Sequence, residues 1–174
     1  MAPPPPVRAL VVADTHLTGA HLDRMPGEVW AMAEEADVVL HAGDVLDAEV
    51  LTALAARAPL HAVRGNNDHD LPDLPEVREL ALGGVAVALV HDSGPTAGRH
   101  RRLARRFPTA EVVVFGHSHA PLVEREGAGP LLVNPGSPVQ RRRQPVHTVA
   151  WLHLAPGAAR AEVVEVGPLA HAGG

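Results

Sequence analysis

Five short motifs carry side chains that can bind metal ions. Two of them, Asp14-x-His16 and His117-x-His119, each offer two donor groups within three residues, and Gly43-Asp44, Gly65-Asn66 and His91 each add one. Carboxylates and imidazoles together suit Mn, Fe, Zn, Ni or Co better than Ca. The adjoining glycines allow sharp turns that bring a backbone close to an ion or a phosphate group. These residue types predict a site for one or two divalent transition-metal ions.

The elements predicted around the motifs bring the donors together. Apolar runs typical of buried strands lead into each motif, at 8–13, 37–41, 60–64, 85–91 and 111–115. Helical spacing over 28–36 and 48–57, the second with Asp47 as N-cap, alternates with the first three runs. In such a sheet, ligands collect beyond the carboxyl ends of the strands. The seven donors expected at that edge are Asp14, His16, Asp44, Asn66, His91, His117 and His119.

The second half of the chain has a different order of predicted elements, with more strands and fewer helices. Runs on either side of Gly83-Gly84 predict a hairpin, and residues 97–107 predict a basic helix. Four further strands, predicted to form a second, largely antiparallel sheet, are expected at 122–125, 131–133, 148–154 and 161–166. We expect one domain over residues 7–166, with disordered tails at 1–6 and 167–174.

Composition excludes several kinds of catalysis. The chain has 174 residues, of which 46% are hydrophobic and 20% charged, as in a packed domain. Cys and Lys are absent, which rules out disulfides, thiolate metal sites, Walker-type phosphate loops and Schiff bases. No apolar run approaches the length of a membrane span, so no membrane partner is expected. The first residues do not resemble a signal peptide, and a cytoplasmic location is predicted.

Charge is distributed unevenly along the chain. Residues 1–87 carry 14 acids and 5 Arg, whereas residues 88–174 carry 6 acids and 10 Arg. Two Arg clusters, Arg99–Arg106 and Arg141–Arg143, are either solvated faces or anion-attracting surfaces, with Arg99 expected to border the site. A nucleic-acid substrate is possible in principle but not favoured, because the net charge is −5 and only 2% of residues are aromatic.

Each motif also has a purely structural interpretation. Asp and Gly are ordinary turn residues, and a single motif is more often a turn than a ligand pair. His41, inside the second strand, either orients a ligand from behind or is a core histidine with its hydrogen bonds satisfied. The imidazoles of His117 and His119, however, have no packing purpose at a strand end. The presence of all five motifs, each at a strand end, favours a metal site.

In this order, the motifs resemble the signature of calcineurin-like metallophosphoesterases. The matching residues are Asp14-x-His16, Gly43-Asp44, Gly65-Asn66-Asn67-Asp68, His91 and Gly116-His117-Ser118-His119. Asn134-Pro135-Gly136-Ser137 is similar to the small bacterial and archaeal phosphodiesterase branch, which is related to the retromer scaffold subunit. The resemblance runs from Val7 to Val166. It implies an α/β fold, a four-layer α/β/β/α sandwich of two mixed sheets flanked by helices.

The resemblance also implies a ligand set and a reaction. It assigns Asp14, His16 and His119 to one ion and Asn66, His91 and His117 to the other, with Asp44 bridging. It implies a phosphoesterase, most simply a phosphodiesterase, in which a metal-bridging hydroxide attacks phosphorus and no protein nucleophile is needed. Asp44, Asn66 and His91 are then catalytic through the ions. Two divalent ions are expected, Mn ahead of Fe, Ni, Zn or Co, with a small phosphorylated substrate; a homodimer is one option.

The chain departs from the superfamily pattern at Asn67. Many members have a histidine there, which assists the leaving group as an acid, and Asn cannot donate a proton in this way. We therefore expect slow turnover and a preference for phosphodiesters or activated leaving groups. Asp68 and His69 are alternative acids, although such residues in a loop are more often turn residues.

Two other functions fit parts of the sequence. A scaffold of the same fold would work through protein contacts, but the complete donor set favours an enzyme. The Gly116–Ala120 segment is a near miss to the nucleophile elbow of serine hydrolases. However, Pro121 opposes the helix that such an elbow requires, and no Asp follows Asp92. Ser118 is expected instead to hold the turn between two ligands.

Overall fold

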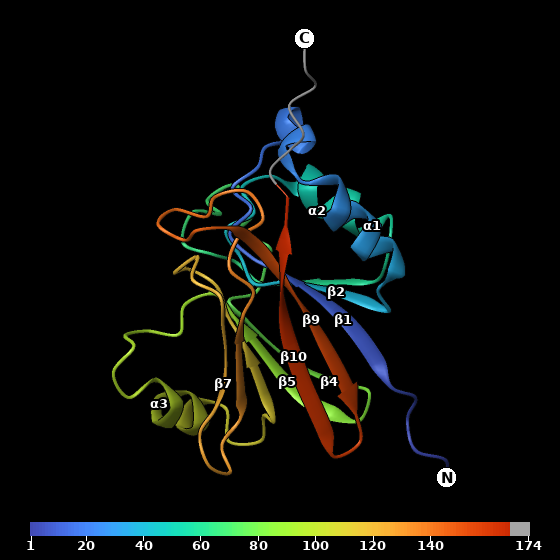
Figure 1. Cartoon of the computed structure of the whole chain (residues 1–174), viewed down its shortest axis with the longest axis vertical. Coiled ribbons are helices and arrows are strands. Elements are labelled where there is room, and N and C mark those ends of the chain that lie inside the picture. The colour runs from blue at the N-terminus through green and yellow to red at the C-terminus, as the bar shows by residue number, and fades with distance from the viewer. Residues whose placement is uncertain (168–174) are drawn as a thin grey trace.

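The computed structural model describes residues 1–167, which form two five-stranded sheets stacked face to face (Figure 1). The first sheet has the order β10-β9-β1-β2-β3, with β1 Val7–Val12, β2 Val38–His41, β3 Leu60–Ala62, β9 His147–Ala155 and β10 Ala158–Val166. The second has the order β4-β5-β6-β8-β7, with β4 Val77–Leu82, β5 Val85–Val90, β6 Val112–Val114, β7 Leu122–Arg125 and β8 Leu131–Asn134. Each sheet contains parallel and antiparallel pairs, so both are mixed.

Helices cover the outer face of each sheet. Helices α1 (Gly27–Glu35) and α2 (Ala48–Ala55), with the 3-10 helix Gly19–Arg24, lie on one side of the molecule, and α3 (Arg99–Arg106) lies on the other (Figure 1). Val29 and Leu54 of the first pair belong to a cluster with Val39 and Trp151 of the first sheet. Leu103 of α3 packs with the outward face of the second sheet. The predicted four-layer α/β/β/α sandwich is confirmed.

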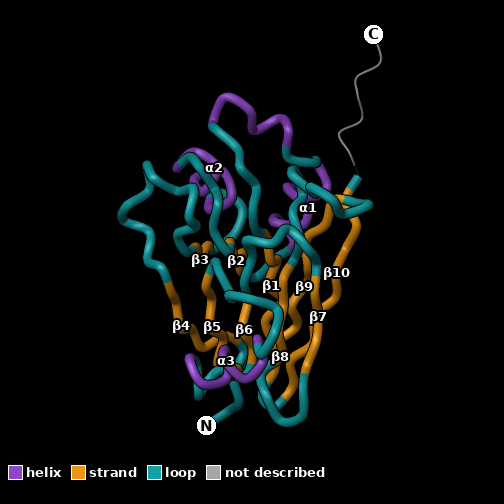
Figure 2. Tube along the Cα trace, turned by 90° about the vertical axis from the view of Figure 1, so that its left-hand side faces the viewer, coloured by secondary structure: helices purple, strands orange, loops and turns teal. Residues whose placement is uncertain are grey.

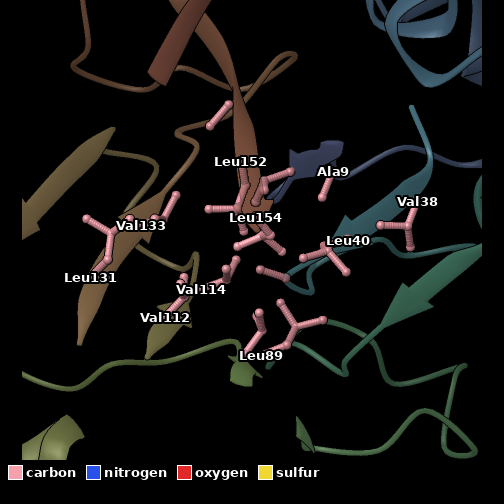
Figure 3. Packing of buried hydrophobic residues seen from close by; sticks show 14 of the residues in the cluster. Ala9, Val38, Leu40, Leu89, Val112, Val114, Leu131, Val133, Leu152 and Leu154 are labelled. Atoms are coloured by element: carbon pink, nitrogen blue, oxygen red, sulfur yellow. The ribbon is translucent and has the colours of Figure 1, made fainter. Parts of the chain in front are cut away.

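Apolar side chains of both sheets fill the space between them. Figure 3 shows residues of both sheets meeting there, among them Leu40 and Leu152 from the first sheet and Leu89 and Val114 from the second. Successive residues of a strand point to opposite faces, so a strand buried on both faces must be apolar throughout. The runs that predicted strands are therefore continuous rather than alternating.

Two local predictions are confirmed by the backbone. Asp47 caps α2, its side chain accepting a hydrogen bond from the backbone N–H of Glu49 over 3.0 Å. β4 and β5 form an antiparallel hairpin, in which Gly83 and Gly84 have φ values of 58° and 77°. Two successive residues with positive φ are what a tight hairpin turn requires.

The prediction for the strands at the end of the chain is wrong. These strands do not form a second, largely antiparallel sheet, because β9 and β10 extend the first sheet beside β1. Of the last four strands, β7 and β8 belong to the second sheet. In that sheet β6 is parallel to both β5 and β8. β9 is buried along most of its length because the second sheet covers one of its faces and the helices cover the other, and its backbone pairs with β1 and β10.

Residues 1–6 are exposed and lack regular secondary structure. The predicted tail at 167–174 falls, from residue 168 on, outside the described residues, and the single domain over 7–166 stays a prediction. None of the helices within residues 1–167 combines the length and hydropathy needed to cross a membrane.

Candidate metal centre

All seven predicted donors follow strands and meet at the seam between the two sheets. Asp14 and His16 follow β1, Asp44 follows β2 and Asn66 follows β3 of the first sheet. From the second sheet, His91 follows β5, and His117 and His119 follow β6. The loops that carry these residues lie between the strands and the upper helices in Figure 2. Each sheet therefore supplies part of one constellation.

Glycine allows the loops after β2 and β3 to approach each other closely. A Cβ on Gly65 would lie 2.1 Å from Oδ1 of Asp44, and a Cβ on Gly43 would lie 2.8 Å from the backbone nitrogen of Gly65. Only a residue without a side chain fits at either position. The glycines in Gly43-Asp44 and Gly65-Asn66 thus bring the two donors together.

Most donors occupy a backbone conformation that residues with side chains rarely adopt. The residues concerned, with their φ values, are Asp14 (54°), His16 (46°), Asp44 (57°), His117 (70°) and His119 (57°). This left-handed region costs roughly 1–2 kcal/mol per non-glycine residue. Such strain gathers at functional sites, where the surrounding structure holds it in place.

The first group of donors consists of Asp14, His16 and His119, whose ligand atoms lie within 4.8 Å of one another. The Nε2 atoms of His16 and His119 are 3.3 Å apart, and His119 Nε2 is 3.6 Å from Oδ1 of Asp14. His119 Nδ1 is bonded to the carbonyl oxygen of Gln140, which can only accept. Nδ1 therefore carries the proton, and a lone pair of neutral His119 points at the other donors.

The second group is built around Asp44 and His91, which also lie within reach of Asp14. His91 Nε2 is 3.5 Å from Oδ2 of Asp44 and 3.0 Å from Oδ1 of Asn66. His117 Nδ1 is 2.9 Å from the same amide oxygen. His91 Nδ1 donates to the carbonyl oxygen of Ala42 over 2.7 Å, which directs Nε2 inward.

Burial governs the ionisation of these groups. It raises the pKa of Asp14 to about 7 and lowers the pKa of His119 to about 4. Burial alone would raise the pKa of Asp44, but hydrogen bonds from His91 and Asn67 outweigh it and hold that pKa below its usual range. Burial alone would lower the pKa of His91, but the hydrogen bond to Asp44 and its charge raise it. His119 is thus held neutral and Asp44 negatively charged, whereas the shifts of His91 and Asp14 favour the protonated form of each.

These contacts fit a cation better than they fit one another. The lone pair on His119 faces a carboxylate and a second imidazole, and Oδ2 of Asp14 is buried with no hydrogen-bond partner. An unpaired buried carboxylate oxygen costs free energy. Opposed lone pairs repel unless a positive charge lies between them. Imidazole nitrogen with carboxylate oxygen is a donor set typical of transition-metal ions.

Two neighbours hold the loops of the site in shape. Asp68 accepts hydrogen bonds from the backbone N–H groups of Asp44, Val45, Leu46 and Gly65 over 2.7–2.9 Å. Asn67 donates to Asp44 from its backbone over 2.9 Å and from its side chain over 2.7 Å. Asp68 therefore stabilises the loops and is not a free acid. Its place in the sequence did not indicate this role.

His41 and Ser118 also have structural roles. His41 is fully buried beneath the site, with Nε2 3.1 Å from the Thr15 hydroxyl and Nδ1 accepting from the N–H of Gly43. Its hydrogen bonds are satisfied, and burial lowers its pKa to about 4. The Ser118 hydroxyl accepts from the side-chain amide of Asn134 over 3.1 Å. After Ser118 the chain continues into β7 and not into a helix, which is incompatible with a nucleophile elbow.

The arginines lie at different distances from the donors. Arg99 stacks over the ring of Phe115, with its guanidinium carbon 5.3 Å from the ring centre. Arg106, at the other end of α3, lines a cleft of about 460 Å³ together with Asn66, His69 and His91. The charge of Arg142 lowers the pKa values of His119 and Asp14. Arg106 and Arg142 could not be singled out within their clusters from the sequence.

Comparison with known proteins gives the same family. Residues 7–157 match the calcineurin-like phosphoesterase superfamily domain. A probable metallophosphoesterase of Methanocaldococcus jannaschii is 32% identical over 135 residues, covering 76% of this chain and 68% of the relative. A predicted phosphoesterase of Streptococcus pneumoniae has a crystal structure with a TM-score of 0.70 at 25% identity, over 97% of this chain and 95% of that chain.

The fold is also shared with Vps29 of Entamoeba histolytica. The crystal structure of a single-substitution variant of that protein gives a TM-score of 0.72 at 20% identity, over 92% of this chain and 99% of that chain. At this identity the likeness concerns the fold alone. The match over residues 7–157, together with the archaeal relative, shows that the chain belongs to the calcineurin-like phosphoesterase superfamily.

Proposed function

We propose that this metallophosphoesterase is a phosphodiesterase that works with two divalent metal ions. One ion is held by Asp14, His16 and His119, the other by Asn66, His91 and His117, and Asp44 is shared between them. The observation that carries the proposal is the inward-facing set of lone pairs around the unpartnered Oδ2 of Asp14. The imidazole and carboxylate donors suit Mn, Fe, Zn, Ni or Co, and we place manganese first because of the family resemblance.

Bound cations of this kind lower the pKa of a water molecule and offset charge on the phosphoryl group. The chain's own residues set the geometry for that chemistry. The carbonyl oxygens of Ala42 and Gln140 accept from Nδ1 of His91 and His119, so that Nε2 of each ring faces the other donors. Asn67 holds both oxygens of Asp44 and leaves them directed at the two donor groups.

The leaving group receives little help from protein acids. During hydrolysis, a water oxygen bonds to phosphorus, the ester P–O bond breaks, and the departing oxygen takes up a proton. The amide of Asn67 is bonded to Asp44, and the Asp68 carboxylate is occupied by four N–H groups. General-acid help is typically worth 10²–10⁴-fold. We therefore expect substrates whose leaving oxygen needs no proton to react fastest.

A paired assay on metal-stripped protein tests this function. Hydrolysis of bis-p-nitrophenyl phosphate and of p-nitrophenyl phosphate would be measured with Mn, Ni, Zn, Mg or no metal added. We expect metal-dependent turnover that favours the diester. Failure to bind any metal would refute the proposal. Binding of two ions without hydrolysis of either compound would instead favour a protein-interaction scaffold of the same fold.

A further inference from the structure

A second cleft adjoins the one beside the metal donors. The groove over α3 has a volume of about 540 Å³ and is lined by Ala97, Gly98, Arg101, Arg102, Arg105 and Arg106. Arg106 also lines the cleft of about 460 Å³ that contains Asn66 and His91. Because Arg106 lines both, the α3 groove lies next to the cleft that contains two of the metal donors.

The positive charge in the α3 groove is uncompensated. Arg101, Arg105 and Arg106 are exposed, and within residues 1–167 none has a carboxylate at ion-pair distance. Arg102 donates to the carbonyl oxygens of Ser93 and Ala97, which hold it in place without neutralising it. Four guanidinium groups therefore face one groove that contains no acid.

Helix stability accounts for only half of this arrangement, because Arg105 and Arg106 lie in the last turn of α3, where the helix dipole favours cations. Arg101 and Arg102 lie in the first turn of α3, where the helix dipole disfavours cations. Arg101 and Arg105, like Arg102 and Arg106, are four residues apart, and like charges at that spacing repel. The repulsion is relieved when an anion lies between the side chains. Arginine guanidinium groups bind phosphate through paired hydrogen bonds.

Among the described residues, the cleft beside the donors has one arginine without an ion-pair partner, Arg106, which it shares with the α3 groove. Arg64 is paired with Glu76 over 2.7 Å, and the oxygens of Asp68 are bonded to backbone N–H groups. Asp92, which also lines this cleft, adds a negative charge. A second anionic group on a substrate in this cleft would therefore be drawn towards the α3 groove.

We propose that the substrate carries a second phosphate group besides the diester that is cleaved, and that this phosphate binds in the α3 groove to Arg101, Arg105 and Arg106. The proposal rests on the proposed phosphodiesterase function and narrows its substrate class to compounds with at least two phosphate groups. The 3′-phosphorylated end of a small nucleotide and the next phosphate of a nucleic-acid strand share this chemistry.

Two chromogenic esters test the proposal. They are the p-nitrophenyl ester of thymidine 5′-monophosphate and the same ester with a 3′-phosphate, which release the same leaving group. With the manganese-loaded chain, we expect the 3′-phosphate to lower KM about tenfold, as one charge-assisted contact would. Equal KM values for the two esters would overturn the proposal.

Substitution of the groove arginines provides the matched comparison. R101A/R105A should remove the KM advantage of the 3′-phosphate and leave turnover of bis-p-nitrophenyl phosphate unchanged. R160A removes the same kind of charge from exposed Arg160 on β10 and should keep the advantage. An advantage that survives R101A/R105A would place the second phosphate elsewhere and refute the assignment.

The groove can be tested separately from the reaction. Titration calorimetry with thymidine 3′,5′-bisphosphate and with thymidine 5′-monophosphate measures the same preference without hydrolysis. If bis-p-nitrophenyl phosphate is not hydrolysed, the proposed function fails, while tighter binding of the bisphosphate would still support the groove. Equal binding of both nucleotides would refute it. The p-nitrophenyl ester of a pentathymidylate shows where the second phosphate comes from. A further fall in KM would indicate a nucleic-acid strand, and an unchanged KM would indicate a small nucleotide.

Discussion

The carboxylate of Asp68 accepts a hydrogen bond from the backbone N–H of Asp44 over 2.9 Å, although the two residues belong to loops that follow different strands. The same carboxylate accepts from Gly65 in its own loop. It thereby joins the loop after β2 to the loop after β3, at the point where both present donors to the site. Asp68 is 1% exposed, so water does not replace these bonds.

Asp68→Asn should destabilise the fold, because the new NH₂ group would face backbone N–H groups that need an acceptor. We expect a loss of about 2–4 kcal/mol, since a buried carboxylate with several donors is removed. For a chain of this size that loss lowers Tm by roughly 5–15 °C. Thermal unfolding of the metal-stripped protein measures it. Asp70→Asn, at an exposed position in the same loop, is the control, and equal shifts in both variants would contradict the role of Asp68.

Asp44→Ala should abolish hydrolysis and reduce bound metal while leaving the fold intact. The side chain lies within 3.5 Å of both His16 and His91, so its loss affects both donor groups. We expect activity to fall at least about 100-fold, the upper end of what even indirect ligand supports are worth. Elemental analysis gives metal content and circular dichroism checks the fold. Asp92→Ala serves as a control in the same cleft, and retained activity in the Asp44 variant would refute its shared role.

Asp14→Asn should stabilise the metal-free chain at alkaline pH. The pKa of Asp14 is raised to about 7 by burial, so the folded chain binds this proton more tightly than the unfolded chain does. That contribution to stability is complete below about pH 4 and is lost as pH rises through 7. The variant lacks the ionisation, so its advantage should grow between pH 4 and 7, to at most about 4 kcal/mol above pH 7.

Urea unfolding at several pH values, with chelator present, measures this difference. An advantage that does not change with pH would contradict the buried ionisation. Adding manganese should reverse the order of stability, because the parent chain keeps an Asp14 carboxylate for the ion and the variant does not.

Asn67→His should raise activity on diesters with poor leaving groups, because an imidazole at this position can donate a proton. The gain on an alkyl leaving group is expected to reach about 100-fold, with little change on bis-p-nitrophenyl phosphate. The ratio of kcat/KM for the two substrates measures it. Asn67→Ala loses the bond to Asp44 without adding an acid and should slow both reactions. Equal losses in the histidine and alanine variants would show that the acid is not what this loop lacks.

The donors could be predicted from the sequence because each follows an apolar run. Strand ends in an α/β sheet converge, so the order of Asp14, Asp44 and Asn66 along the chain was enough to predict a shared location. The glycines before Asp44 and Asn66 were a second indication of a shared location. Glycine is needed there because the two loops approach each other closely. Predicting that His119 lies beside Asp14 and His16 needed only one further inference, that the strand before His119 also ends at this edge.

The partners of β9 could not be predicted from its pattern. Alternation shows which residues of a strand are buried, not which strand lies beside it. However, the run around Trp151 is apolar on both faces, a feature typical of an interior strand, and that signal could have indicated its place beside β1. The role of Asp68 was hidden for another reason: an acid that bonds to backbone N–H groups 20 or more residues away looks like any turn residue in the sequence.

The location of the donors at the seam has a mechanical consequence. Apolar side chains between stacked sheets attract without direction, so the contacts between the two layers include few directed bonds. Coordination has direction, and the donors of Asp44 and His91 come from opposite layers. A bound ion would therefore cross-link the two layers at one end of the sandwich, by bonds of fixed direction, in addition to the apolar packing between them.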